Sequence, residues 1–144
     1  MFYLDASALV KNYLQESYTA DVRALFTGGA MIGTGVLSKA EVAAAFAKAV
    51  RVGYITSVEA RAAWDAFCQH WPALIRLRPT EPLITHAGEL ALSHGLRGYD
   101  AIHLATALYW QTLLGAPITL GSFDRQLWDT AKAVGLAVWP SARP

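Results

Sequence analysis

Apolar residues along this chain fall into short runs that alternate with longer stretches of helical spacing. The chain opens with the apolar run Phe2–Leu4, which ends at Asp5. In the next segment apolar side chains recur three and four positions apart, as they do on one face of a helix. The same alternation continues to the end of the chain. It predicts strands near residues 1–5, 30–33, 74–77, 117–120 and 136–139, and helices near 6–15, 17–26, 38–50, 56–70, 83–93, 99–114 and 124–134.

Local signals support some of these boundaries. Thr56 and Glu59 have the spacing of a capping box, which satisfies free backbone N–H groups where a helix begins. Trp64, Phe67 and Trp71 then recur at helical spacing, which is typical of side chains in a core. Because strands and helical crossovers alternate throughout, the pattern predicts an α/β fold with a parallel sheet covered by helices on both faces.

The length of 144 residues suits one domain, and no linker, repeat or low-complexity segment divides the chain. We therefore expect a single domain over residues 1–144. Although 54% of the residues are hydrophobic, no apolar run approaches the roughly 18 residues of a membrane span. The first residues also lack the basic stretch of a signal peptide, so a cytoplasmic location is expected. The one cysteine, Cys68, lies in a helical pattern that indicates packing.

Four acids lie near the ends of predicted elements, within or beside apolar sequence. Asp5 and Asp124 each follow a predicted strand, whereas Glu41 and Asp100 lie near the starts of predicted helices. Open α/β sheets bind ligands at the carboxyl ends of their strands, so these carboxylates are expected to converge there. Carboxylates without clustered cysteine or histidine suit one or two Mg²⁺ or Mn²⁺ ions better than zinc.

Each of these acids also has a purely structural explanation. An acid in the first turn of a helix interacts favourably with the helix dipole by about 0.3–1 kcal/mol. Ser38 and Glu41 even have the spacing of a capping box. Four caps would need four separate reasons, whereas one shared cation site accounts for all four acids.

Net charge by itself identifies no partner, because 12 basic and 11 acidic side chains give +1. If four of the acids line one pocket, the other seven leave the remaining surface basic overall. A surface of that kind could face a polyanion.

Four segments, in order along the chain, resemble the PIN-domain family, especially the VapC-like toxins of bacterial toxin–antitoxin pairs. The likeness runs from about Phe2 to Trp139, and it is carried by Asp5-Ala-Ser7-Ala-Leu, Leu-Ser-Lys-Ala-Glu41, Tyr-Asp100-Ala-Ile-His-Leu-Ala-Thr-Ala and Ser122-Phe-Asp124-Arg-Gln-Leu. The resemblance implies a PIN-like three-layer α/β/α sandwich with a central parallel sheet. It also implies an endoribonuclease that cleaves RNA, a cognate antitoxin as partner, and a homodimer.

The resemblance assigns roles to individual residues. It implies that Asp5, Glu41, Asp100 and Asp124 bind Mg²⁺ or Mn²⁺ and carry out catalysis. Asp5 and Asp100 are the expected direct ligands, Asp124 binds directly or through water, and Glu41 is a ligand or the base that positions the attacking water. The hydroxyls of Ser7 and Ser122 would support this site; threonine is frequent in the family where Ser122 stands, and either residue supplies the hydroxyl.

Basic and histidine side chains near the acids have two interpretations each. The candidates for contacts with RNA phosphates are Lys11, Lys39, Arg97 and Arg125, and an ion pair within the protein is the alternative for every one of them. His103 follows Asp100 by three positions, but its apolar helical setting indicates a packed or hydrogen-bonded histidine rather than a metal ligand.

Two other functions stay open. An aspartate after the first strand also serves as the nucleophile of haloacid dehalogenase-like phosphotransfer domains. The segment Asp5-Ala-Ser7 lacks the second aspartate that such enzymes use, which disfavours this alternative. A catalytically silent PIN-fold interaction module would have the same fold, and the presence of all four acids disfavours it.

Overall fold

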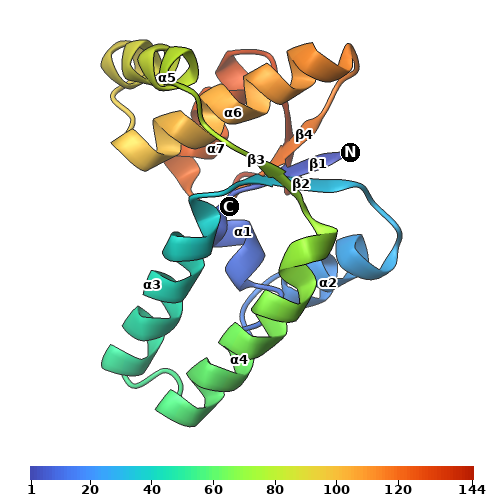
Figure 1. Cartoon of the computed structure of the whole chain (residues 1–144), viewed down its shortest axis with the longest axis vertical. Coiled ribbons are helices and arrows are strands. Elements are labelled where there is room, and N and C mark those ends of the chain that lie inside the picture. Colours follow the sequence, from blue (N-terminus) through green and yellow to red (C-terminus); the bar gives the residue numbers. More distant parts are fainter.

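Five short parallel strands form the centre of the molecule, in the order β3-β2-β1-β4-β5 (Figure 1). The computed structural model describes residues 1–144. Every neighbouring pair of strands is parallel, which confirms the predicted sheet type. The strands are β1 (Phe2–Leu4), β2 (Ile32–Gly35), β3 (Ile75–Leu77), β4 (Thr119–Gly121) and β5 (Ala137–Trp139).

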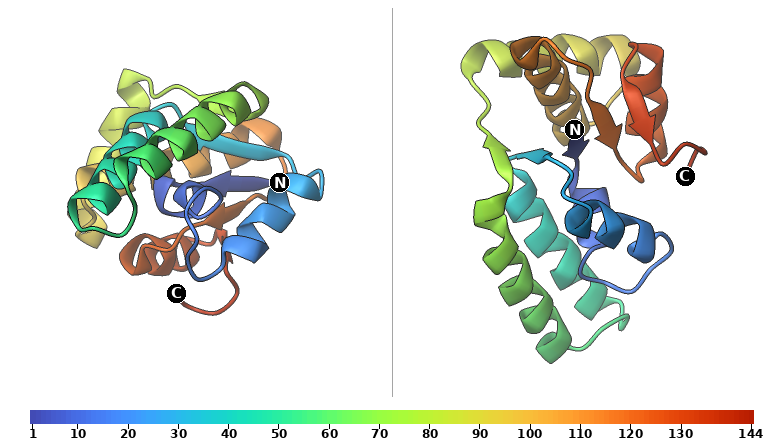
Figure 2. Two further views of the ribbon diagram at one scale, coloured as in Figure 1. Left: turned by 90° about the horizontal axis from the view of Figure 1, so that it is seen from below. Right: turned by 90° about the vertical axis from the view of Figure 1, so that its right-hand side faces the viewer.

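Helices cover both faces of this sheet, so the predicted three-layer α/β/α sandwich is confirmed (Figure 2). One layer contains α5, α6 and α7, and the other contains α1 to α4. In the second layer, α3 and α4 form a hairpin that extends away from the sheet (Figure 1). The helices are α1 (Ala6–Val10), α2 (Thr19–Thr27), α3 (Ser38–Arg51), α4 (Ser57–His70), the 3₁₀ turn η1 (Trp71–Ala73), α5 (Glu81–His94), α6 (Gly98–Leu114) and α7 (Arg125–Ala133).

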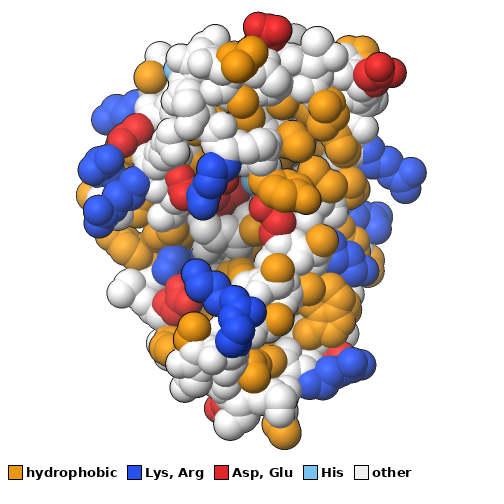
Figure 3. All heavy atoms as spheres, turned by 90° about the vertical axis from the view of Figure 1, so that its left-hand side faces the viewer, with side chains coloured by type: hydrophobic (Ala, Val, Ile, Leu, Met, Phe, Trp, Pro, Cys, Tyr) orange, Lys and Arg blue, Asp and Glu red, His pale blue; other side chains and the backbone are white.

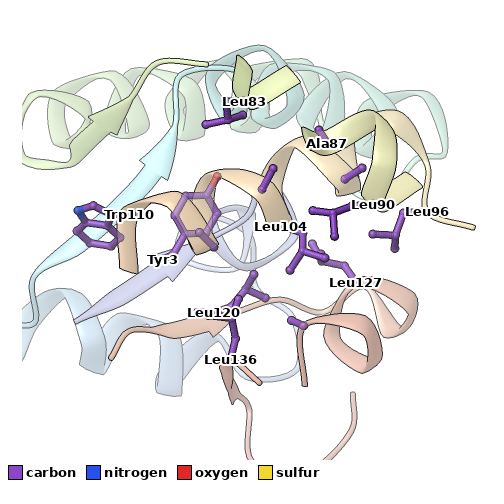
Figure 4. Close-up of a cluster of buried hydrophobic side chains, with 14 of the residues drawn as sticks. Tyr3, Leu83, Ala87, Leu90, Leu96, Leu104, Trp110, Leu120, Leu127 and Leu136 are labelled. Carbon is purple, nitrogen blue, oxygen red and sulfur yellow. The ribbon is translucent and has the colours of Figure 1, made fainter. Parts of the chain in front are cut away.

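Two hydrophobic clusters lie on opposite faces of the sheet. Successive side chains of a strand point to opposite faces, and β1 divides its residues accordingly. Tyr3 packs in the cluster with Leu104 of α6 and Leu127 of α7 (Figure 4). Leu4 packs in the other cluster, with Val42 of α3. The central strand is thus buried on both faces, which fixes the position of the residue that follows it.

Local predictions in the second layer are confirmed. Thr56 and Glu59 form the capping box at the start of α4, with each side chain accepting from the backbone N–H of the other. Phe67 and Trp71 are buried, and the partly buried Cys68 packs against the same cluster. No helix combines the length and hydropathy needed to cross a bilayer.

The predicted boundaries differ from the structure at two places. The first helix ends at Val10 rather than near Gln15, because the N–H groups of Asn12 and Tyr13 bond three residues back and tighten the chain into turns. Strand β2 begins at Ile32, which pairs with Phe2, and ends at Gly35, two residues beyond the predicted end. The added residues are small or polar and gave no strand signal.

Close packing against the sheet makes a glycine of β2 necessary. A Cβ at Gly33 would lie 2.7 Å from two ring carbons of the buried Trp110. We expect Gly33→Ala to lower the free energy of unfolding by about 1–3 kcal/mol, measured by urea denaturation. Gly88→Ala is the matched control, because no atom lies within 4 Å of its Cβ position on α5, and it should be neutral or stabilising by up to about 1 kcal/mol. Equal losses in both variants would contradict the packing argument.

Candidate functional site

Asp5 lies where β1 ends and α1 begins, and its carboxylate is buried. It caps α1 by accepting from the N–H of Ala8 at 2.9 Å. The Ser7 hydroxyl donates to it at 2.7 Å, and the Ser122 hydroxyl at 2.6 Å. Burial raises the pKa of the Asp5 carboxyl above its ordinary value, and the positive charge of His103 and these hydrogen bonds offset only part of that effect.

The two serines join the ends of β1 and β4. Ser122 is fully buried, and its hydroxyl donates to Asp5 while accepting from the N–H of Asp124 at 3.0 Å. The Ser7 hydroxyl accepts from the N–H of Phe123 at 2.8 Å. Asp124 in turn caps α7 through the N–H of Leu127. Two aspartates that follow neighbouring strands are therefore held in one hydrogen-bonded unit.

Arg97 connects Asp124 with the third acid. Its Nη2 donates to Asp124 Oδ2 at 2.6 Å, and its Nε donates to Asp100 Oδ2 at 2.7 Å. The hydrogen bond and the charge of Asp100, together with Asp124, raise the pKa of Arg97. On the face in Figure 3, acidic side chains gather around a hollow near mid-height, with basic side chains beside and below them. One exposed guanidinium is thus shared by two carboxylates from different elements.

Glu41 reaches the same region through a buried histidine. Its Oε2 is hydrogen-bonded to His103 Nε2 at 2.8 Å, and His103 Nδ1 is hydrogen-bonded to the Tyr3 hydroxyl at 2.9 Å. Burial alone would lower the pKa of His103, but the bond to Glu41 and the charges of Asp5, Glu41 and Asp100 raise it overall. The expectation of a hydrogen-bonded histidine is confirmed.

Asp5, Asp124 and Asp100 are therefore linked by hydrogen bonds, and Glu41 interacts with the group through the charge of His103. The four acids do not form a ready-made metal cage. No group of three or more His, Cys, Asp or Glu side chains has the arrangement of a metal-binding site as they lie. The oxygens of Asp100, Asp124 and Glu41 bond to Arg97 and His103 instead. Their chemistry fits Mg²⁺ or Mn²⁺, since the donors are hard oxygens and Arg97 already acts as a shared cation for two of them.

One structural explanation for Glu41 is wrong. Leu37, not Ser38, is the N-cap of α3, and no side chain caps that end. The Ser38 hydroxyl is hydrogen-bonded to the Thr34 hydroxyl at 2.7 Å. Because the Ser38 hydroxyl is bonded to Thr34 in β2, it does not cap α3 and no capping box forms. The Glu41 carboxylate bonds to His103 instead.

The family model of the PIN domain matches residues 2–136 of this chain. The chain belongs to the PIN-domain family. This membership decides against the phosphotransfer alternative.

This PIN domain is also similar to named proteins of Mycobacterium tuberculosis and Rickettsia felis. It is 37% identical to Ribonuclease VapC45 of M. tuberculosis, over 98% of this chain and 96% of that protein. The structure of M. tuberculosis VapC20, described as a toxin that cleaves the sarcin-ricin loop, has a TM-score of 0.67 at 17% identity, with 100% of both chains covered. The structure of VapBC2 from R. felis, bound to a DNA fragment from their promoter, has a TM-score of 0.62 at 16% identity, with 96% of this chain and 97% of that chain covered. The two structures support the fold alone.

The basic candidates of the PIN domain all have partners within the protein. Lys11 pairs with Glu16, and Lys39 lies over the rings of Trp64 and Trp71. Arg125 donates to the C-terminal carbonyl, and Arg97 bonds to Asp100 and Asp124 as described. Their role toward RNA stays a prediction.

Sequence reasoning missed two connections in the PIN domain. The Arg97–Asp124 bond joins residues 27 positions apart, and nothing in the pattern pairs them. Tyr3 resembles any strand residue in sequence, yet its hydroxyl orients His103 and through it Glu41. Its hydroxyl, in an otherwise apolar strand, was the only sequence feature that indicated a buried hydrogen bond.

The Ser122 hydroxyl should contribute measurably to stability because it donates to a buried carboxylate and accepts from a partly buried N–H at once. We expect Ser122→Ala to lower the free energy of unfolding in EDTA by about 1–3 kcal/mol. Thr85→Ala is the control, since its exposed hydroxyl only bonds to the carbonyl of Glu81 in its own helix, and it should stay within about 0.5 kcal/mol. Urea denaturation of both variants tests this, and an unaffected Ser122→Ala would contradict it.

Proposed function

We propose that this PIN domain is a Mg²⁺- or Mn²⁺-dependent endoribonuclease that acts as the toxin of a toxin–antitoxin pair. One observation carries the proposal. Asp5, Asp124 and Asp100 are linked through Ser122 and Arg97 at the carboxyl ends of the central strands. Glu41 bonds to His103, whose charge acts on Asp5. The similarity to Ribonuclease VapC45 supports RNA as the substrate.

The metal ion would be held by Asp5 and Asp100 as direct ligands and by Asp124 directly or through water, with Glu41 beside it. Such an ion supplies activation of a water molecule and charge neutralisation at the phosphodiester. The buried Asp5 has no lysine or arginine bound to it, so a cation beside it would offset the cost of its burial. Ser7 and Ser122 keep that carboxylate in place before the cation arrives.

Glu41 is suited to move a proton during cleavage. His103 holds its Oε2, while its Oε1 makes no hydrogen bond within the protein. We assign to Oε1 the acceptance of a proton from the attacking water. Because His103 is itself fixed by Tyr3, the position of this oxygen is set by the core.

An antitoxin would bind elsewhere on the molecule. A groove of about 900 Å³ lies between the segment after α1, α2 and α4, and contains none of the four acids. Its walls are largely apolar and include Leu14, Phe26 and Ile55. We assign this groove to an apolar segment of the antitoxin, because its walls are largely apolar and it lies apart from the four acids. We also propose a homodimer, which sedimentation of the isolated protein would test.

Removing the central carboxylate should abolish cleavage and preserve the fold. In Asp5→Asn the amide oxygen can still accept from Ala8, so α1 keeps its cap. Cleavage of total RNA in Mg²⁺ or Mn²⁺ should fall at least about 100-fold, and EDTA should stop the wild type. Asp65→Asn is the control, since Asp65 pairs only with Arg61 on the surface of α4. If the folded wild type, free of antitoxin, cut nothing in either metal, the silent interaction module would be favoured.

Arg97 should compete with the metal ion for Asp100 and Asp124. The Arg97 guanidinium is exposed, so each of its two ion pairs is worth up to about 1 kcal/mol. Arg97→Gln should therefore tighten Mn²⁺ binding by up to about 30-fold. Mn²⁺ titration followed by electron paramagnetic resonance measures this directly, without RNA. Arg61→Gln is the control because its partner lies outside the site. Weaker Mn²⁺ binding by Arg97→Gln would show that the guanidinium supports the metal rather than competing with it.

A further inference from the structure

A second, smaller cavity lies directly beside the acidic site. Its volume is about 370 Å³, near the lower end of ligand pockets. The lining residues Ser7, Ala45 and Phe123 adjoin three of the acids: Ser7 bonds to Asp5, Ala45 lies one turn after Glu41, and Phe123 precedes Asp124. A group bound in this cavity would therefore sit next to a phosphodiester held at the acids.

The cavity contains an ion pair and an aromatic ring. Lys11 Nζ lies 2.9 Å from Glu16 Oε2 and 4.5 Å from the centre of the Phe123 ring. The Lys11 side chain is only 12% exposed. The Phe123 ring is held in turn by Tyr18 and Trp139, at centroid distances of 5.1 and 5.6 Å. The polar groups and the ring are thus positioned before any ligand binds.

We infer that this cavity is a nucleobase subsite that selects guanine beside the phosphodiester to be cut. Proteins recognise single-stranded RNA by packing bases on aromatic side chains and bonding to their Watson–Crick edges. An ammonium next to a carboxylate matches the guanine edge. Lys11 donates to O6, and Glu16 accepts from both N1–H and N2–H.

The other bases match this pair less well. Adenine and cytosine each offer the carboxylate a single amino group, and uracil offers it only N3–H. Glu16 can therefore accept two hydrogen bonds from guanine and fewer from the edge of any other base. Ser7 ties the subsite to the acids, because its hydroxyl bonds both to Asp5 and to the N–H of Phe123. Guanine binding and phosphate placement are thereby joined in one rigid unit.

The decisive experiment compares guanosine with inosine, which lacks only the N2 amino group. This inference rests on the proposed ribonuclease, so short single-stranded RNAs carrying either base at the mapped cleavage site are cut in Mn²⁺. The wild type should favour guanosine by about 10- to 100-fold in kcat/KM, the effect of one hydrogen bond to a charged group. In Glu16→Gln the ratio should fall close to one. Glu89→Gln, on α5 and outside the cavity, should keep the wild-type ratio.

A second measurement separates this inference from the proposed activity. Binding of guanosine, inosine, adenosine, cytidine and uridine to the wild type is followed by saturation-transfer NMR in EDTA, where no cleavage occurs. Guanosine should bind best, and Glu16→Gln should lose that preference. Guanosine binding by a protein that never cuts RNA would overturn the ribonuclease and leave the subsite. Metal-dependent cleavage with equal rates for guanosine and inosine would overturn the subsite and leave the ribonuclease.

Discussion

The burial of one carboxylate organises this molecule. Asp5 follows a strand that is covered on both faces, so its charge is drawn away from water unless other groups compensate. Ser7, Ser122 and the N–H of Ala8 provide hydrogen bonds, but none of them provides a positive charge. The remaining acids, with Arg97 and His103, surround this point. The packing that buries β1 also buries the Asp5 charge, and a bound cation would offset the cost of that burial.

Sequence pattern predicted most of the fold, because short apolar runs and helical spacing are local signals. It also predicted that Asp5 and Asp124 lie close together, since both follow apolar runs and parallel strands bring such positions to one edge of the sheet. A role as helix cap and a role as metal ligand are compatible for both aspartates. Each aspartate caps the helix that follows it with one oxygen, and the other oxygen faces Ser122 or Arg97.

What the sequence could not supply was the set of long-range partners. Ser38 had the right spacing for a cap, but a threonine from the end of β2 takes its hydroxyl. The first helix ends early because the N–H groups of Asn12 and Tyr13 bond three residues back, and no residue type in this segment predicts those turns. Tyr3 and Arg97 acquire their roles only when residues separated by 100 and 27 positions meet. Spacing rules describe neighbours along the chain, whereas these contacts depend on how the layers pack.

His103 has a consequence for the mechanics of the molecule. The sheet separates the two hydrophobic clusters, yet this side chain, on a helix of one layer, bonds to Glu41 on a helix of the other. That bond passes beyond the ends of the strands, where no sheet intervenes. Any sliding of one helical layer relative to the other would displace the Glu41 carboxylate from His103 and Asp100, which both lie on α6. The site is therefore sensitive to the relative position of the layers, and a partner that grips only the α1 to α4 layer can alter its geometry without touching an acid.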